Sequence, residues 1–457
     1  MQIKNSSRWG LLALVAFIAL PVSLPAQQGR NAASAPGTEI IDGADVDSLV
    51  ARALMVNPQI RAARERIEAA RARIEPAGAL PDPMLGVGIM NLPVSDPGFS
   101  DMMTMKTVAV GQTVPFPGKL SLARRAAGLE VAAAEARLRA VELDVVTQVR
   151  QAYYDLAFLD RALDVLRQNQ NVMVNFMQVT ESRYAVGAGA QHDVLKAGVE
   201  TARLAAEAVM LSEQSGAARA RLNALLDRAS ETPVAGPRVP EHIARAAVAA
   251  TPSEIRFTSG ALGARAADSP LAALEQLQER AIRNNPTLRA HAADISAQVA
   301  RAELAEKAHL PDFDVSLQYG QRADRSDMVN LMVSVPLPLH KARRQDQQLI
   351  ESRAELAALE AEYHVMVNRL RADVAEQYAE LERVRAQLAL FVKSIIPQGR
   401  AALESAISSF QVGRVDFLTL LENQTTLYNY ETAYVRALAG FAKSLAELER
   451  IVGQEVL

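Results

Sequence analysis

The chain contains one sequence pattern twice. Residues 52–81 and 280–311 both begin near an Asn-Pro step, continue through a run of helix-forming residues and lead into a Leu-Pro-Asp triplet. The matching positions are Asn57-Pro58 with Asn285-Pro286, and Leu80-Pro81-Asp82 with Leu310-Pro311-Asp312. Internal duplication predicts two copies of one structural unit and so restricts the architecture before any other motif is considered.

Each copy continues with two strand-like runs in which apolar and polar residues alternate. The four predicted strands are 83–91, 105–114, 312–320 and 328–336. Alternation with a period of two gives each strand one apolar and one polar face. Prolines at 115, 117, 336 and 338 cannot donate to a strand ladder, so they are expected to end the second strand of each copy.

Two hairpins per chain are too few to close a sheet, and an isolated hairpin is marginally stable. Three chains would supply twelve strands, an even number suited to an outer-membrane barrel. The alternative is a small soluble sheet packed on the helices.

Long helices are predicted after each proline pair. Residues 119–186 contain no proline and one interior glycine, and their apolar positions recur at the coiled-coil spacing. The second copy repeats that spacing from Leu356 to Ile395, and Pro397 is expected to kink its helix. Val-Gly turns at 186–187 and 412–413 lead into return helices at 190–228 and 415–453. The predicted fold is therefore mainly α, with duplicated coiled-coil hairpins forming a tube.

The N-terminus has the pattern of a secretory signal peptide. Lys4 and Arg8 supply the positive region, Leu11 to Leu20 the apolar region, and cleavage is expected after Ala26. The predicted organisation is a signal peptide (1–26), a flexible lead (27–44), the first repeat (45–228), an irregular linker with a short helix near 240–249 (229–270) and the second repeat (271–457). No other stretch approaches the length of a transmembrane helix.

Composition excludes several functions. A net charge of −3 over 457 residues does not favour a nucleic-acid partner, and the absence of cysteine excludes disulfides and thiolate metal sites. The six histidines are scattered, without a metal-binding pair or a phosphate-binding glycine loop. We therefore expect no enzyme, no cofactor and no metal site. A methionine group around the first hairpin (Met84, Met90, Met102, Met103 and Met105) could bind soft metal ions, but methionine is also a common core filler.

At this point the residues resemble the outer membrane efflux protein family, the TolC-like channels of tripartite pumps. The resemblance rests on the duplication, the Asn-Pro helix starts, the prolines that end the strands, and the turns "RYAVGAGAQHDVL" and "SFQVGRVDFLTLLENQ". It covers nearly all of the mature chain. It implies a homotrimer in outer-membrane lipid, with a twelve-stranded barrel and a periplasmic helical tube, working with a periplasmic adaptor and an inner-membrane pump.

The resemblance also assigns roles to the two turns. The implied adaptor-docking tips are Val186, Gly187, Ala188, Val412, Gly413 and Arg414. Asp416 matches the first of two acidic rings that narrow the family's entrance, whereas Thr419 stands where the second acid is expected. The short second tip resembles members paired with heavy-metal pumps.

The charged tip residues each have a structural alternative. Asp416 and Asp193 could form a cation-attracting entrance ring, since three copies of a carboxylate would face one lumen. Either could instead cap the helix that follows its turn, and the cap is favoured for Asp193. Arg414 could pair with an acid on a neighbouring helix or remain solvated.

The predicted function is a passive outer-membrane exit duct, and the resemblance of the short second tip implies heavy-metal cations as its substrates. The alternatives are a periplasmic adaptor, which usually has one hairpin and more β structure, and a soluble coiled-coil scaffold, which would not explain the four strands.

Overall fold

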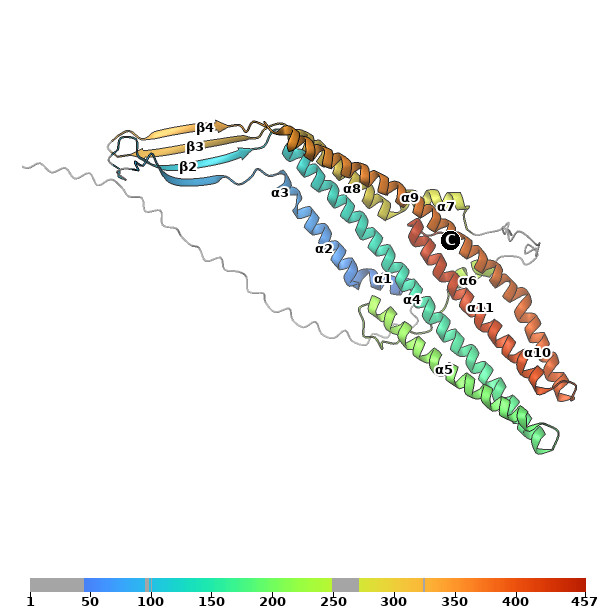
Figure 1. Cartoon of the computed structure of the whole chain (residues 1–457). Coiled ribbons are helices and arrows are strands. Elements are labelled where there is room, and N and C mark those ends of the chain that lie inside the picture. The colour runs from blue at the N-terminus through green and yellow to red at the C-terminus, as the bar shows by residue number, and fades with distance from the viewer. Residues whose placement is uncertain (1–44, 95–97, 100, 249–270, 324) are drawn as a thin grey trace, which may run out of the picture. The chain divides into compact units, whose positions relative to one another are not determined.

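The computed structural model describes residues 45–94, 98–99, 101–248, 271–323 and 325–457. The first repeat contains α1 (Val46–Val56), α2 (Pro58–Ala72), α3 (Ile74–Gly78), β1 (Met84–Met90), β2 (Met105–Val114), α4 (Lys119–Ala185) and α5 (Gln191–Leu225). A short helix, α6 (Glu241–Val248), follows. The second repeat contains α7 (Leu274–Asn284), α8 (Pro286–Lys307), β3 (Phe313–Arg322), β4 (Met328–Ser334), the 3₁₀ turn η2 (Lys341–Arg343), α9 (Gln345–Leu390), the π-helical turn η3 (Phe391–Ile395), α10 (Ile396–Gln411) and α11 (Phe417–Val452). Figure 1 shows these elements in sequence colours.

An asparagine at the matching position of each repeat both caps a helix and donates a hydrogen bond to a distant carbonyl. Asn57 caps α2 by accepting from the Gln59 N–H at 2.8 Å, and its Nδ2 donates to the Leu225 carbonyl at the end of α5 at 3.1 Å. In the second repeat, Asn285 accepts from the N–H groups of residues 287 and 288 and donates to the Ile451 carbonyl at 3.0 Å. The predicted caps are confirmed. Each asparagine also ties the start of its repeat to the end of the return helix.

The long helices differ between the repeats. α4 runs without interruption for 67 residues, about 100 Å at 1.5 Å per residue. In the second repeat the helix widens into η3 immediately before α10, which has Pro397 near its start. Proline lacks the N–H that would continue the α-helical ladder and crowds the preceding turn, so the chain changes its hydrogen-bond pattern there. The expected irregularity thus takes the form of a π-helical turn.

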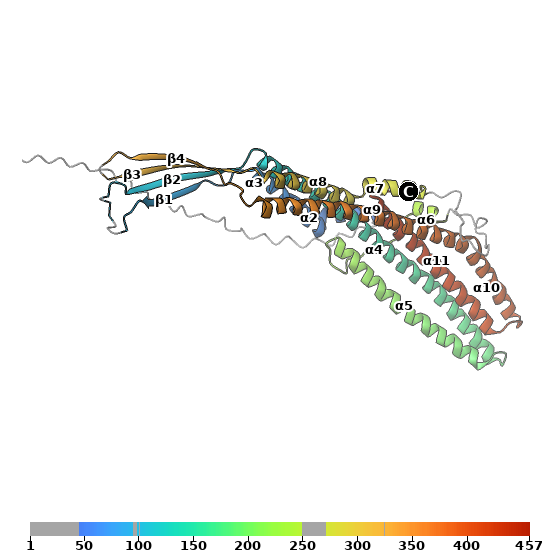
Figure 2. The ribbon, with the colours of Figure 1, turned by 45° about the horizontal axis from the view of Figure 1, so that its top comes forward.

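The four strands form one antiparallel sheet in the order β1-β2-β3-β4, which Figures 1 and 2 both show. The central β2–β3 pair joins the two repeats and places Val114 opposite Phe313. The register gathers apolar residues on one face and mostly small or polar residues on the other. The apolar face carries, among others, Leu85, Val87, Val108, Val110, Leu317, Tyr319, Val329 and Leu331.

A polar joint, made of an ion pair and hydrogen bonds, links the two repeats beside the end of β2 and the start of β3. The Lys119 ammonium lies 2.8 Å from an Asp312 carboxylate oxygen and donates to the Leu310 carbonyl at 2.7 Å. The same carboxylate oxygen accepts from the Phe116 N–H at 2.8 Å. Lys119 favours the ionised form of Asp312 and, with the N–H bond, outweighs the effect of burial, so the pKa of Asp312 lies below its ordinary value.

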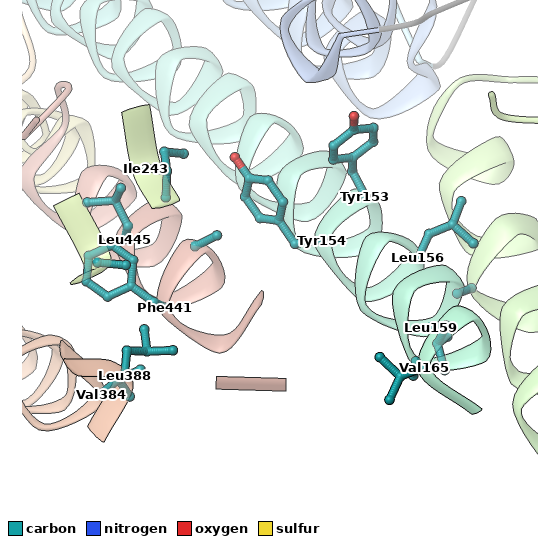
Figure 3. Close-up of a cluster of buried hydrophobic side chains, with 14 of the residues drawn as sticks. Tyr153, Tyr154, Leu156, Leu159, Val165, Ile243, Val384, Leu388, Phe441 and Leu445 are labelled. Atoms are coloured by element: carbon teal, nitrogen blue, oxygen red, sulfur yellow. The ribbon is translucent and has the colours of Figure 1, made fainter. Parts of the chain in front are cut away.

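The main hydrophobic core lies between the long helices. Figure 3 shows Phe441 and Leu445 of α11 beside Ile243 of α6, with Leu388 of α9 nearby. On α4, Tyr153 and Tyr154 pack edge to face with ring centroids 5.8 Å apart. Thus α6, in the linker between the repeats, adds apolar surface to the core formed by both.

Most predicted elements lie within a few residues of the observed ones. β4 ends at Ser334 rather than 336, and β3 continues to Arg322. The run of helix-forming residues that follows Asn57-Pro58 breaks at Arg73 into α2 and α3. The predicted signal peptide, the lead to residue 44 and linker residues 249–270 lie outside the described residues. Within the described ranges, no helix is both long and apolar enough to cross a membrane.

Candidate docking tips and entrance

The first tip is a glycine turn between α4 and α5. Gly187 has φ of +74°, a left-handed conformation that a side chain would strain. The turn closes through bonds from the Gly187 N–H to the Tyr184 carbonyl at 3.0 Å and from the Ala188 N–H to the Arg183 carbonyl at 2.8 Å. These bonds satisfy carbonyls at the end of α4 and hold Val186 outward, 78% exposed.

The second tip repeats this turn between α10 and α11. Gly413 has φ of +73°, and its N–H donates to the Phe410 carbonyl at 3.0 Å. The Arg414 N–H donates to the Ser409 carbonyl at 2.9 Å, and Val412 is 68% exposed. Both tips therefore present an uncovered valine beside a glycine.

Arg183 connects the two tips, a contact that the sequence analysis did not identify. Its guanidinium donates to the Phe410 carbonyl at 2.8 Å and lies over the Phe410 ring, 4.6 Å from the centroid. It also reaches the Ala188 carbonyl at 3.5 Å. The only signal in the sequence is a basic residue in the last helical turn, which usually interacts with its own helix.

A groove of about 350 Å³ lies between the tips. Its lining comes from both repeats and includes Arg183, Asp193, Phe410, Asp416 and Phe417. The structure therefore brings the two predicted entrance carboxylates to one groove, although they are far apart in sequence.

Asp416 is the N-cap of α11. Its carboxylate accepts from the Thr419 N–H at 2.9 Å and from the Thr419 hydroxyl at 2.6 Å. The hydroxyl bond, followed by the N–H bond, lowers the pKa of Asp416, and Lys196 contributes by its charge. Asp416 is therefore ionised at neutral pH while remaining exposed, so a capping role and an entrance role are compatible.

The prediction that Asp193 caps α5 is wrong. The N-cap is Ala190, which makes no side-chain cap bond, and Asp193 lies three residues later in the first turn. The Asp193 N–H itself donates to the Ala190 carbonyl at 3.1 Å, so this residue is already inside the helix. Its carboxylate still lies near the positive end of the helix dipole, 3.1 Å from the His192 ring.

Other predicted polar roles are not tested by contacts within one chain. Within the described residues Arg414 makes no ion pair, so its predicted pairing with an acid stays a prediction. No group of three or more His, Cys, Asp or Glu in the described ranges could hold a metal ion. Met84, Met90 and Met105 lie in β1 and β2, where Met90 pairs with Met105.

The family model described as outer membrane efflux protein matches residues 49–228 and 277–454, one segment in each repeat. The chain is 22% identical over 351 residues to the cobalt-zinc-cadmium resistance protein CzcC of Cupriavidus metallidurans, covering 76% of this chain and 77% of that protein. It is 26% identical over 433 residues to the pyoverdine export outer membrane protein OpmQ of Pseudomonas aeruginosa, covering 90% and 84%. The solved structure of the outer membrane protein VceC of Vibrio cholerae has the same fold, with a TM-score of 0.73, 19% identity and coverage of 90% of this chain and 97% of that one.

Proposed function

Because the chain belongs to the outer membrane efflux protein family, we propose that three copies of it form the passive exit duct of a tripartite efflux pump. As a member of this family the chain is an outer-membrane efflux channel with a periplasmic helical part, and it is not an enzyme. Family membership also removes the support for the two alternatives, an adaptor and a soluble scaffold.

The observation that carries the proposal is the pair of duplicated tips. Each ends in an exposed valine beside a glycine with positive φ, and Arg183 joins the two. Such a surface suits the apolar tip of a helical partner, here a periplasmic adaptor hairpin. An inner-membrane pump would deliver the substrate and the energy, since the channel has only to provide a wet path.

The docking role predicts a separation between conductance and export. Val186→Asp combined with Val412→Asp places charges on both tips without disturbing buried residues. We expect the purified double variant to keep wild-type conductance in planar bilayers but to abolish export in cells. Loss of conductance would indicate damage to the channel itself, and normal export would remove these valines from docking.

The substrate proposed is a heavy-metal cation. Asp193 and Asp416 line one groove at the tips, and three copies would place six carboxylates around the entrance, partly offset by Lys196. Similarity to a cobalt-zinc-cadmium resistance protein supports the same class. An organic substrate is the second candidate. It is favoured by the pyoverdine-export relative, whose identity to this chain and coverage of it are greater than those of the cobalt-zinc-cadmium resistance protein.

The cation selectivity of single channels tests the proposed role of Asp416 at the entrance. Asp416→Lys should lower the cation selectivity of single channels, because each trimer would exchange three negative charges for three positive ones. Glu213→Lys, at an exposed position on α5, makes the same charge change away from the tips and should have a smaller effect. Equal selectivity in Asp416→Lys and wild type would remove Asp416 from the entrance.

Separately, a gene deletion that leaves tolerance to cobalt, zinc and cadmium unchanged would contradict the metal substrate.

A further inference from the structure

A cleft of about 770 Å³ lies where the linker crosses the long helices. Its walls come from α4, α5 and α11, with α4 in the middle (Figure 1), and from residues 236–239 of the linker. The cleft is larger than the groove between the tips, and the two have no lining residue in common. A cavity of this volume suits one small organic molecule.

The linker wall of the cleft is held against α4. The Arg238 N–H donates to the Tyr153 hydroxyl at 3.3 Å, and Tyr153 is only 2% exposed. The preceding residue, Pro237, is buried. The backbone that carries the Arg238 side chain is therefore fixed at the mouth of the cleft.

Positive groups outnumber negative groups in the lining. The charged residues that line the cleft are Arg161, Arg167, Arg219, Arg238, Asp160 and Asp164. The Asp164 carboxylate is shared by Arg167, at 3.3 Å, and Arg161, at 3.8 Å. Within the described residues, neither Arg219 nor Arg238 makes an ion pair or a side-chain hydrogen bond. Two guanidinium groups therefore border the cleft without an anionic partner.

Asp160 is the carboxylate nearest to being enclosed. It accepts from the Ser215 hydroxyl at 3.2 Å, and Ser215 is buried. Burial raises the pKa of Asp160, whereas the bond from Ser215 and the charge of Arg219 act in the opposite direction. Arg219 is thus near enough to Asp160 to act by its charge, but it forms no ion pair with it.

Apolar side chains from α4 and α11 complete the cleft. They are Phe158, Leu163, Tyr434, Val435 and Leu438. The Phe158 ring lies under the guanidinium of Arg436, 5.3 Å from the ring centroid. Burial raises the pKa of Tyr434 and the charge of Arg161 opposes this shift, so Arg161 also lies near the α11 side. The cleft therefore combines apolar surface with several guanidinium groups.

We propose that this cleft binds a small amphipathic organic anion, with an oxyanion head group and an apolar body. The guanidinium groups of Arg219 and Arg238 donate to the head, because their planar forks match a carboxylate or a phosphate. The apolar body lies against Phe158 and Leu438. A cationic ligand does not fit, since the arginines exceed the aspartates. The site does not depend on the proposed exit duct, and its ligand need not be the exported substrate.

Such a ligand would connect parts of the chain that are distant in sequence. It would contact α4 and α5 of the first repeat, α11 of the second repeat and the linker between them. A ligand that binds only the folded chain stabilises it by mass action. Occupancy should therefore stiffen this region of the helices.

Titration calorimetry of the purified full-length protein in a neutral maltoside detergent tests the binding. The probes are naphthoate and naphthyl phosphate, which share one apolar body and differ in the head group. Naphthylmethylammonium carries the same body with a positive charge. We expect saturable binding of one anion per chain, with the stronger probe identifying the head group, and no saturable binding of the cation. Equal binding of the cation, or no saturable binding of either anion, would overturn the proposal.

Substitutions in the lining should change the affinity in opposite directions. Arg219→Gln and Arg238→Gln should each weaken binding about tenfold, because each removes a charge-assisted hydrogen bond. Asp160→Asn removes a negative charge and can still accept from Ser215, so it should bind the anion more tightly. Arg221→Gln, at an exposed position on α5 outside the cleft, is the matched control and should bind as wild type does. Equal affinities in all four variants would show that the anion binds elsewhere.

Amide exchange locates the bound probe. Saturating anion should slow exchange in residues 236–239 and 434–439 of wild type and of Arg221→Gln, and should have a smaller effect in Arg219→Gln. Slowing confined to other segments would contradict the site. Conductance in planar bilayers separates the two proposals, because loss of anion binding with normal conductance would overturn this site and leave the exit duct standing.

Discussion

The two repeats share their frame but differ in chemistry at matching positions. In the return hairpins a shift of 226 residues relates Val186 to Val412, Gly187 to Gly413 and Leu225 to Ile451. The glycine turns and the asparagine-to-carbonyl bonds are the same in both. The same shift relates Ala190 to Asp416, Arg183 to Ser409 and Asn223 to Glu449. The backbone requirements of the hairpin are thus retained in both repeats, whereas each of these three matching pairs has a charged residue in one repeat and an uncharged residue in the other.

The largest effect on stability is expected at the two asparagines that the repeats share. Asn57→Ala and Asn285→Ala should each destabilise the fold by about 2 kcal/mol, because each loses a helix cap and leaves a carbonyl without its donor. The measurement is the unfolding free energy of purified protein, or its dissociation temperature. Asn57→Asp and Asn285→Asp keep the cap but lose the donor, so they should cost less. Markedly unequal losses in the two alanine variants would break the equivalence of the repeats.

The second prediction concerns the position occupied by Asn223 and Glu449. Asn223 is neutral and donates to the carbonyls of Ser230 and Thr232, whereas Glu449 is largely buried beside Arg150. Burial raises the pKa of Glu449, although Arg150 opposes the effect. The folded chain therefore binds this proton more tightly than the unfolded chain. Its stability should fall as pH rises from the ordinary pKa of glutamate to the raised value.

Glu449→Gln should remove this slope, and Glu213→Gln, at an exposed position, should leave it. Unfolding measured across the acidic range checks the comparison. An unchanged slope in Glu449→Gln would mean that the second repeat does not carry this titration.

The smallest effect is expected at the tips. Arg183→Met keeps the apolar stem but loses the bond to the Phe410 carbonyl, so the link between the tips should weaken by about 1 kcal/mol. Faster amide exchange around residues 410–414 is the readout. Ser409→Ala changes the matching position in the second repeat and should have little effect. Equal exchange in Arg183→Met and wild type would show that the bond does not hold the tips together.

Local signals made much of the fold predictable. An asparagine before a proline specifies a helix start, strict alternation specifies a strand, and a Val-Gly pair specifies the turn, so Asn57, β3 and Gly413 could be placed from sequence.

Features that depend on distant residues were not predictable. The Arg183–Phe410 and Arg150–Glu449 contacts join residues more than two hundred positions apart, and no local pattern encodes them. Asp193 follows a glycine turn as Asp416 does, but the helix after the first turn begins three residues earlier relative to the acid. The cap position therefore falls on Ala190 and not on the carboxylate.

The mass of the intact protein extracted from outer membranes, measured by native mass spectrometry in detergent, tests the central claim most directly. Two repeats that leave a bare strand at each edge of one sheet should require further copies, and the account predicts a single species of three chains. A folded species of one chain, stable without detergent, would contradict it.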